Sequence, residues 1–332
     1  MAKRSPISDQ DDQRRLLVLI ACRYTRPDMS LLVTGTIAID TIQTPTDKAE
    51  GVLGGSCAYF AAAASFQSPV RVVAAVGGDW PSGHRAILES FDNVCLGGLE
   101  ERPGAKTFAW GARYLENLNQ RETLFTKLGV LDEDPPPVPD RYLDSEYVFL
   151  ANTHPKVQAQ FLSHFPKRKL VVADTVDLWI NVARPELLGV LKQVDGLILN
   201  DSEALQMTEI TNAVTAARRL MEHGPTFVVV KKGEHGAVLV HREGVATIPA
   251  FPAEQHQIVD PTGAGDAFAG GLMGHIASVG MTNFFTIQSA MAWGTVTASF
   301  AIESFGLLRL TQITRRDIDE RLRQFQAFAR VG

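Results

Sequence analysis

The chain has 332 residues, of which 45% are hydrophobic and 21% are charged, and its formal net charge is −5. This is the composition of an ordinary soluble globular protein, and the negative charge gives no support to nucleic-acid binding. No apolar stretch approaches the roughly 20 residues of a membrane helix, so we expect no membrane partner. The three cysteines have no metal-ligand spacing, which favours a reduced, cytoplasmic setting.

The N-terminal residues 1–28 are expected to lie outside the core fold. Basic residues precede the apolar run Leu16–Ala21, but this run is shorter than the roughly 7–15 residues of a signal-peptide core. Met29 directly precedes a strand-like run, Leu31–Val33. We therefore divide the chain into an N-terminal extension, 1–28, and one domain over 29–332.

The first half of this domain is predicted to mix buried and exposed elements. Thr36–Ile39 continues the strand Leu31–Val33 after an interruption at Gly35. An alanine-rich helix over 56–66 and a short β-branched strand, Val70–Val76, follow. Aromatic and polar residues alternate roughly through 106–125, which indicates exposed strands.

Strands and helices alternate regularly in the second half. Strands are predicted at 147–150, 170–173, 196–199 and 227–230, and the last long helices at 264–279, 283–302 and 311–328. This order predicts an α/β fold with a mainly parallel sheet and helices on both faces. Ligands of such sheets bind beyond the carboxyl ends of the strands.

The most informative segment reads Asp-Pro-Thr-Gly-Ala-Gly-Asp, from Asp260 to Asp266. Gly263, Ala264 and Gly265 precede a predicted helix, whose open N–H groups and dipole favour an anion. The neighbouring carboxylate of Asp266 can take the proton of a hydroxyl that attacks phosphorus. The segment therefore predicts phosphoryl transfer, although it has neither the third glycine of a dinucleotide site nor the Gly-Lys-Ser/Thr of a P-loop.

The same segment resembles the C-terminal signature of the ribokinase-like (PfkB) carbohydrate kinases. The paired glycines Gly54 and Gly55 resemble the N-terminal signature of that family, and Gly77-Gly78-Asp79 resembles another of its segments. The resemblance extends over nearly the whole chain from about Leu31. It implies a ribokinase-like fold with a small β-strand lid formed near 37–53 and 105–126.

On the nucleotide side, the resemblance implies ATP and Mg²⁺ as cofactors. Asp266 would be the catalytic base, and the amides of Gly263, Ala264 and Gly265 would hold the charge that develops on the γ-phosphate. Asn200-Asp-Ser-Glu203 matches a motif that organises Mg²⁺ and its waters, whereas the residues alone also fit a helix cap.

A turn after a predicted strand matches the nucleotide-side turn of the family. Lys231, Gly233 and Gly236 would approach the phosphates, and Thr262 joins them as a nucleotide-side contact. A monovalent cation is a further candidate cofactor.

On the acceptor side, Asp40 matches the family's hydroxyl-binding aspartate, next to Gly54 and Gly55. Tyr59 stands where the sugar kinases commonly have an asparagine, which disfavours ribose itself and suggests a more aromatic acceptor. The lid residues Arg113 and Arg121 can each meet an anionic acceptor or be a solvated charge. Further candidates for acceptor contacts follow two of the predicted strands, at Asn152 and Asp174.

We therefore predict an ATP-dependent kinase that phosphorylates a hydroxyl of a small sugar or sugar-like acceptor. A nucleoside kinase of the same family is the alternative. A non-catalytic protein that binds sugars or nucleotides is the alternative from another class. Because lid strands in this family often pair between subunits, we also expect a homodimer through the lid.

Overall fold

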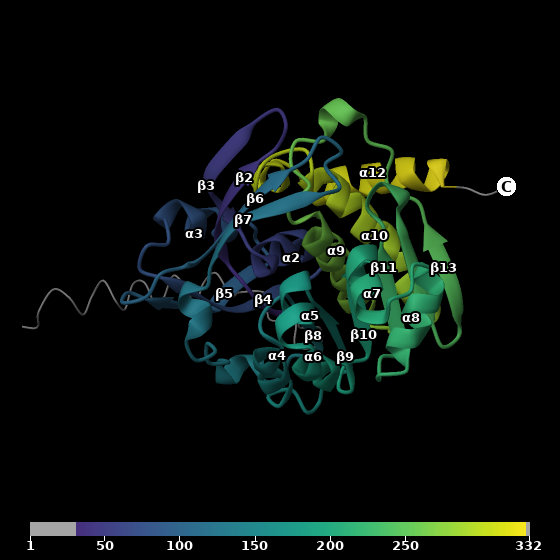
Figure 1. The fold of residues 1–332 in the computed structure, drawn as a ribbon, viewed down its shortest axis with the longest axis horizontal. Coiled ribbons are helices and arrows are strands. Elements are labelled where there is room, and N and C mark those ends of the chain that lie inside the picture. Colours follow the sequence, from purple (N-terminus) through teal and green to yellow (C-terminus); the bar gives the residue numbers. More distant parts are fainter. Residues whose placement is uncertain (1–30, 330–332) are drawn as a thin grey trace, which may run out of the picture.

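The computed structural model describes residues 31–329, which form an α/β unit with one large and one small sheet (Figure 1). The predicted N-terminal extension, 1–28, lies outside the described residues. Within the described part of the chain, no helix is both long enough and apolar enough to cross a membrane.

The large sheet contains nine strands of the described chain, in the order β13-β12-β11-β10-β9-β8-β1-β4-β5. All neighbouring strands are parallel except β12, which is antiparallel to both of its neighbours. The prediction of a mainly parallel sheet is therefore confirmed. Its strands are β1 (Leu31–Thr34), β4 (Val70–Gly77), β5 (Val94–Arg102), β8 (Tyr147–Leu150), β9 (Leu170–Asp174), β10 (Gly196–Asn200), β11 (Phe227–Lys231), β12 (Ala237–His241) and β13 (Gly244–Ile248).

Helices cover both faces of this sheet, so its central strands are buried on both sides. Alternate residues of β1 face opposite layers: Leu31 and Val33 join one core cluster, and Leu32 joins the other. The first layer contains α2 (Ser56–Ser65), α3 (Ser82–Glu89), α9 (Ala264–Val279), α10 (Phe284–Ala301), α11 (Leu308–Thr311) and α12 (Arg315–Phe328). The second contains α4 (Pro155–Leu162), α5 (Asp177–Val182), α6 (Arg184–Leu191), α7 (Asp201–Thr208) and α8 (Ala213–Met221).

The small sheet has the order β3-β2-β6-β7 and is drawn in purple and blue in Figure 1. Its strands are β2 (Ala38–Gln43), β3 (Lys48–Gly54), β6 (Phe108–Tyr114) and β7 (Arg121–Lys127). The two outer pairs are antiparallel hairpins, and β2 and β6 join them as a parallel pair. Both segments that the sequence predicts as lid strands lie in this sheet.

The prediction of one strand interrupted at Gly35 is wrong, because the two runs belong to different sheets. Thr34 is the last residue of β1, and its carbonyl accepts a hydrogen bond from Ala151 at 2.8 Å. The chain then leaves the large sheet at its carboxyl edge and enters the small one. The small sheet is consequently attached beside the edge where ligands of parallel sheets bind.

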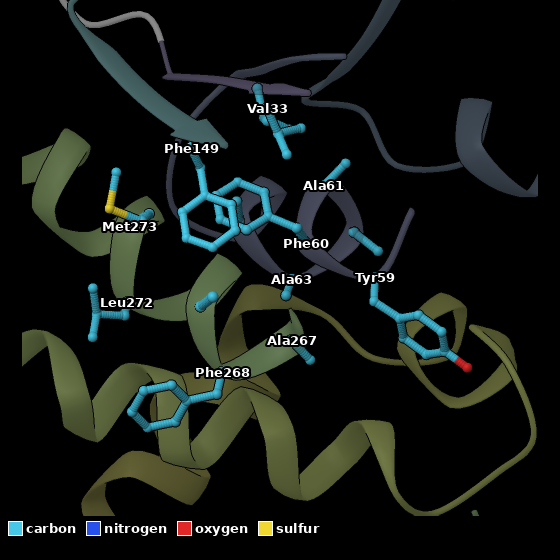
Figure 2. Packing of buried hydrophobic residues seen from close by; sticks show 14 of the residues in the cluster. Val33, Tyr59, Phe60, Ala61, Ala63, Phe149, Ala267, Phe268, Leu272 and Met273 are labelled. Carbon is cyan, nitrogen blue, oxygen red and sulfur yellow. The ribbon is translucent and has the colours of Figure 1, made fainter. Parts of the chain in front are cut away.

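Helices α2 and α9 pack very closely against each other in the first layer. Phe60 of α2 stacks on Phe149 of β8 with ring centroids 4.4 Å apart, and α9 lies beside them (Figure 2). A Cβ atom at Gly270 of α9 would lie only 2.4 Å from the carbonyl oxygen of Phe60. This close approach holds the first turn of α9 in a fixed place relative to the strand ends.

We predict that Gly270→Ala destabilises the protein although alanine is the better helix former by about 1 kcal/mol. The added methyl group meets backbone, so overpacking should lower the free energy of unfolding by about 1–3 kcal/mol. The control is Gly189→Ala in α6, where an added Cβ meets nothing within 4 Å and should be neutral or stabilising. Urea unfolding measures both variants, and equal stability of Gly270→Ala and the unmodified protein would contradict the close packing.

Candidate active site

Polar residues gather where the central strands of the large sheet end. Asp174 ends β9, Asn200 ends β10 and Lys231 ends β11, and the paired strands bring these three side chains to one edge. The first turn of α9 lies at the same edge, because Lys231 reaches it. The structure thus brings together residues that the sequence analysis selected from separate motifs.

The first turn of α9 forms a cradle of main-chain groups. Gly263 precedes it in the left-handed conformation with φ of 72°, and a Cβ there would lie 2.4 Å from the ring of Tyr59. A Cβ at Gly265 would lie 2.6 Å from Nζ of Lys231. The N–H of Ala264 donates to the carbonyl of Pro261 at 3.2 Å, and the first amides of a helix have no acceptor within the helix. This turn therefore places main-chain N–H groups beside an ammonium group.

Asp266 lies in this first turn, where burial raises the pKa of its carboxyl group and the positive charges of Lys231 and Arg121 oppose the rise. Burial and the charge of Asp266 raise the pKa of Asp174 well above its usual range. The two carboxyl groups also share a hydrogen bond, which raises the pKa of Asp174 and lowers that of Asp266. These opposite shifts favour Asp174 as the donor of that hydrogen bond and Asp266 as its acceptor.

Asp40 of β2 is a buried carboxylate of the small sheet that faces the same cluster. The N–H of Gly55 donates to it, whereas its Oδ1 has no hydrogen-bond partner among the described residues. Burial, followed by the charges of Asp260 and Asp266, raises its pKa well above the usual range. Gly54 leaves room for it, since a Cβ there would overlap Oδ2 of Asp40. A buried carboxylate oxygen without a partner is suited to accept a ligand hydroxyl.

Asn200 and Glu203 form a capping box at the start of α7. Glu203 donates its N–H to Oδ1 of Asn200, and Asn200 donates its N–H to Oε2 of Glu203, both at 2.8 Å. The helix cap that the sequence analysis left open as an alternative is thus present. Burial raises the pKa of Glu203, and the nearby charge of Lys231 opposes it.

Thr262 connects the loop before α9 to the small sheet. Its N–H donates to Oδ1 of Asp260 at 2.8 Å, and its hydroxyl bonds the hydroxyl of Tyr114 at 3.1 Å. The sequence analysis missed Tyr114, and no local signal could have paired residues so far apart in the chain. Burial raises the pKa of Asp260 to about 6, and its Oδ2 has no partner among the described residues.

The two arginines of the small sheet lie on different faces. Arg113 bonds Oε1 of Gln43 at 3.2 Å and lies 3.9 Å from Glu122, on the face opposite to its neighbour Tyr114. Arg121 is paired directly with Tyr114, so its side chain shares the face that meets α9. The structure therefore does not bring Arg113 to the carboxylates, and it brings Arg121 there instead.

The remaining predicted residues lie around this centre. Tyr59 is buried, and its hydroxyl points away from the Phe60 ring (Figure 2). Asn152 accepts a hydrogen bond from the indole of Trp179 at 2.8 Å. The turn from Gly233 to Gly236 contacts the small sheet, because Glu234 accepts a hydrogen bond from Asn119 at 3.3 Å.

Comparison with known proteins identifies the family. The model of the pfkB family carbohydrate kinases matches residues 154–312. The chain is also 31% identical over 250 residues to a cytidine kinase of Thermococcus kodakarensis, which covers 74% of this chain and 87% of that protein. The chain belongs to the PfkB family of carbohydrate kinases. It is therefore a phosphotransferase with a hydroxyl acceptor, in a family of ATP-dependent kinases.

Solved structures of nucleoside kinases share its fold. The nucleoside kinase of Methanocaldococcus jannaschii superposes with a TM-score of 0.71 at 21% identity, covering 89% of this chain and 98% of that one. A nucleoside kinase of Burkholderia thailandensis in complex with ADP-inosine gives 0.72 at 18% identity, covering 91% and 98%. These structures confirm the predicted fold class, and the family match and the relation to the cytidine kinase confirm the predicted family and kinase activity.

The capping box predicts a clear difference between two substitutions of Glu203. Glu203→Ala removes one side of the box and should lower the free energy of unfolding by about 0.5–2 kcal/mol. Glu203→Gln keeps an acceptor oxygen at the same place and should unfold close to the unmodified protein. Thermal and urea unfolding of both variants test this, and equal loss in the two would contradict a role for the cap.

Proposed function

We propose that this PfkB kinase transfers the γ-phosphoryl group of ATP to a ribose hydroxyl of a nucleoside, with Asp266 as the general base. The observation that carries the proposal is the position of Asp266 in a helix turn whose amides adjoin the ammonium group of Lys231. The base then acts on the acceptor oxygen, and the amides and the ammonium group act on the phosphoryl group that this oxygen attacks.

The nucleoside as acceptor rests on the residues around Asp40. Trp110 of β6 pairs in register with Asp40, so an indole lies beside the carboxylate with the unpartnered oxygen. Tyr59 adds a second ring where sugar kinases commonly have an asparagine. A carboxylate that accepts ribose hydroxyls next to an aromatic ring suits a molecule with both a sugar and a base. The relation to a cytidine kinase supports the same choice.

The residues of the chain have separate tasks in the reaction. Asp40 orients the acceptor, and Asp266 takes the proton from its hydroxyl as the oxygen attacks phosphorus. The amides of Gly263, Ala264 and Gly265, with Lys231, stabilise the charge that develops on the transferred group. Asp174 donates its hydrogen bond to Asp266 and so keeps the base ionised.

Asn200 and Glu203 would hold Mg²⁺ through its waters. The donor set fits this ion, because it consists of carboxylate and amide oxygens, and Oδ1 of the neighbouring Asp174 lacks a partner among the described residues. When bound, the ion neutralises phosphate charge. Gly233, Gly236 and Thr262 border the same space on the nucleotide side.

Asp260 is our candidate ligand for a monovalent cation. It is fully buried, and Oδ2 has no partner in the described part of the chain. Replacing tetramethylammonium chloride by potassium chloride should raise the melting temperature of the protein and not that of Asp260→Asn. An equal response of both proteins would remove this assignment.

A homodimer through the small sheet is a further proposal. β7 forms one edge of that sheet and is mostly exposed, and pairing with a second copy would protect such an edge. Light scattering at micromolar concentration decides between a monomer and a dimer.

A panel of acceptors tests the choice of substrate. Cytidine, adenosine, inosine, ribose, fructose and inositol are each incubated with ATP and Mg²⁺, and ADP formation is measured. Turnover with nucleosides alone supports the proposal, whereas turnover with ribose, fructose or inositol alone favours a sugar or polyol kinase. Binding of ATP without transfer to any acceptor would indicate the non-catalytic alternative.

We predict that Asp266→Asn lowers kcat by about 10²–10⁴-fold, the usual contribution of a general base. The fold should be unaffected, because the amide is isosteric with the carboxyl group. Asp92→Asn, a substitution at an exposed loop position, is the matched control and should retain full activity. Near-normal turnover of Asp266→Asn at saturating ATP would reject Asp266 as the base.

The raised pKa of Asp266 predicts the acid side of the activity profile. A base acts when it is deprotonated, so kcat/KM should be constant at high pH and fall as the pH drops through the pKa of Asp266. Since burial raises this pKa, the fall should begin at a higher pH than for an ordinary aspartate. Asp174→Ala removes the hydrogen-bond donor and should move the fall to still higher pH. A profile that is flat to the ordinary aspartate range would contradict this.

A further inference from the structure

A β-bulge lies directly opposite Asp40 in the small sheet. Asp40 of β2 pairs with Val52 of β3. The next pair joins Thr41 to Glu50, so Gly51 is an extra residue of β3. Its φ of 67° lies in the left-handed region, which is the usual conformation of a glycine in the first position of such a bulge. Bulges beside active sites commonly re-aim a side chain, so the geometry of this bulge contributes to the direction of the Asp40 carboxylate.

A histidine of the first helix layer holds this bulge. His84 of α3 donates from Nε2 to the carbonyl oxygen of Gly51 at 3.0 Å, because a carbonyl group can only accept. His84 is only 8% exposed, and its Nδ1 is buried without a partner among the described residues. Burial lowers the pKa of His84, and the bond to Gly51 opposes this change. One turn later Leu88 is buried in the first core cluster, so the histidine projects from a helix that is itself packed in place.

The segment from Gly77 to His84 contacts both strands that flank β2. Thr107 directly precedes β6, and its N–H donates to Oδ1 of Asp79 at 2.7 Å. The hydroxyl oxygen of Thr107 also accepts a hydrogen bond from the N–H of Gly77 at 2.9 Å. On the other side of β2, His84 bonds Gly51 of β3. The strand that carries the acceptor carboxylate is therefore held between two strands that are both attached to this one segment.

We infer that His84 is a positioning residue for the acceptor, because it holds the bulge at Gly51 and thereby orients the carboxylate of Asp40 toward the acceptor hydroxyl. This inference rests on the proposed function, in which Asp40 binds that hydroxyl. The imidazole bonds the bulge and acts on the acceptor only through Asp40. Loss of the imidazole should therefore weaken the use of the acceptor and leave the use of ATP unaffected.

Steady-state kinetics of the full-length protein test this role, with ATP, Mg²⁺ and cytidine, adenosine or inosine as acceptor. His84→Leu removes the donor and keeps a side chain of similar size. It should raise KM for the nucleoside by about 10–10²-fold, because a misplacement of about 1 Å can cost 10²-fold. KM for ATP should stay close to that of the unmodified protein. His84→Gln places an amide donor near the position of Nε2 and should restore most of the acceptor affinity.

A second variant reaches the bulge without touching His84. In Gly51→Ala the added Cβ meets nothing within 4 Å, so the substitution disfavours only the left-handed backbone of the bulge. It should raise KM for the nucleoside in the same way as His84→Leu and again spare KM for ATP.

A double-mutant cycle separates positioning from a general loss of stability. Asp40→Ala should itself raise KM for the nucleoside. Adding His84→Leu to it should raise KM little further, because both changes act on the same contact. The matched control is His164→Leu, at an exposed turn after α4, which should retain full activity. Melting temperatures verify that all variants are folded.

The outcomes distinguish this inference from the proposed function. An unchanged KM for the nucleoside in both His84→Leu and Gly51→Ala, with Asp40→Ala impaired, would overturn the inference. Additive increases in the double variant would overturn it as well. If Asp40→Ala is unimpaired, or if the unmodified protein phosphorylates none of the three nucleosides, the proposed function fails instead.

Discussion

The concentration of buried carboxyl groups around one ammonium group is the constraint on which the site depends. Asp40 and Asp174 are almost fully buried, and the charge of Asp266 at the start of α9 acts on both. Burial makes each charged form costly, and mutual repulsion adds to that cost. Lys231 opposes the rise in pKa of Asp266 and Asp174, and the N-terminal end of α9 also favours negative charge there.

Close packing fixes the position of α9 and so keeps these carboxyl groups in place. The helix packs on α2 at the distance that Gly270 permits, and its first turn is held against Tyr59 at Gly263. The loop before it is tied to Asp260 and to Tyr114. A cluster of like charges would push flexible segments apart, and here the main chain that carries them is tightly packed.

Much of this arrangement could be predicted from the sequence because local signals were strong. The run from Asp260 to Asp266 combines small residues, a helix start and a carboxylate, and that pattern has few other uses. The regular alternation of strands and helices in the second half is also a strong local signal, and it predicts the parallel sheet. The strand ends at Asp174, Asn200 and Lys231 could be placed at one edge, because parallel strands share their direction.

Other features depend on contacts that no local pattern encodes. The segment after Gly35 looks like a continued strand, yet it pairs in another sheet, because pairing is decided by distant partners. From the sequence alone, Arg113 and Arg121 cannot be told apart, because both are arginines of the same exposed hairpin. Only the register of β6 with β7 shows which one faces Asp266. Glu203 illustrates a third case, since one motif serves both as a helix cap and as a candidate metal site.

The parallel pairing of β2 with β6 limits how the small sheet can move. It unites two hairpins that are far apart in the chain, and Asp40 and Trp110 sit opposite each other on it. Any displacement of this sheet must carry both hairpins together, since separating them would expose a row of backbone donors and acceptors. The carboxylate of Asp40 and the indole of Trp110 therefore move together as parts of one sheet. In the proposed reaction, the hydroxyl contact and the aromatic contact to the acceptor would then shift at the same time.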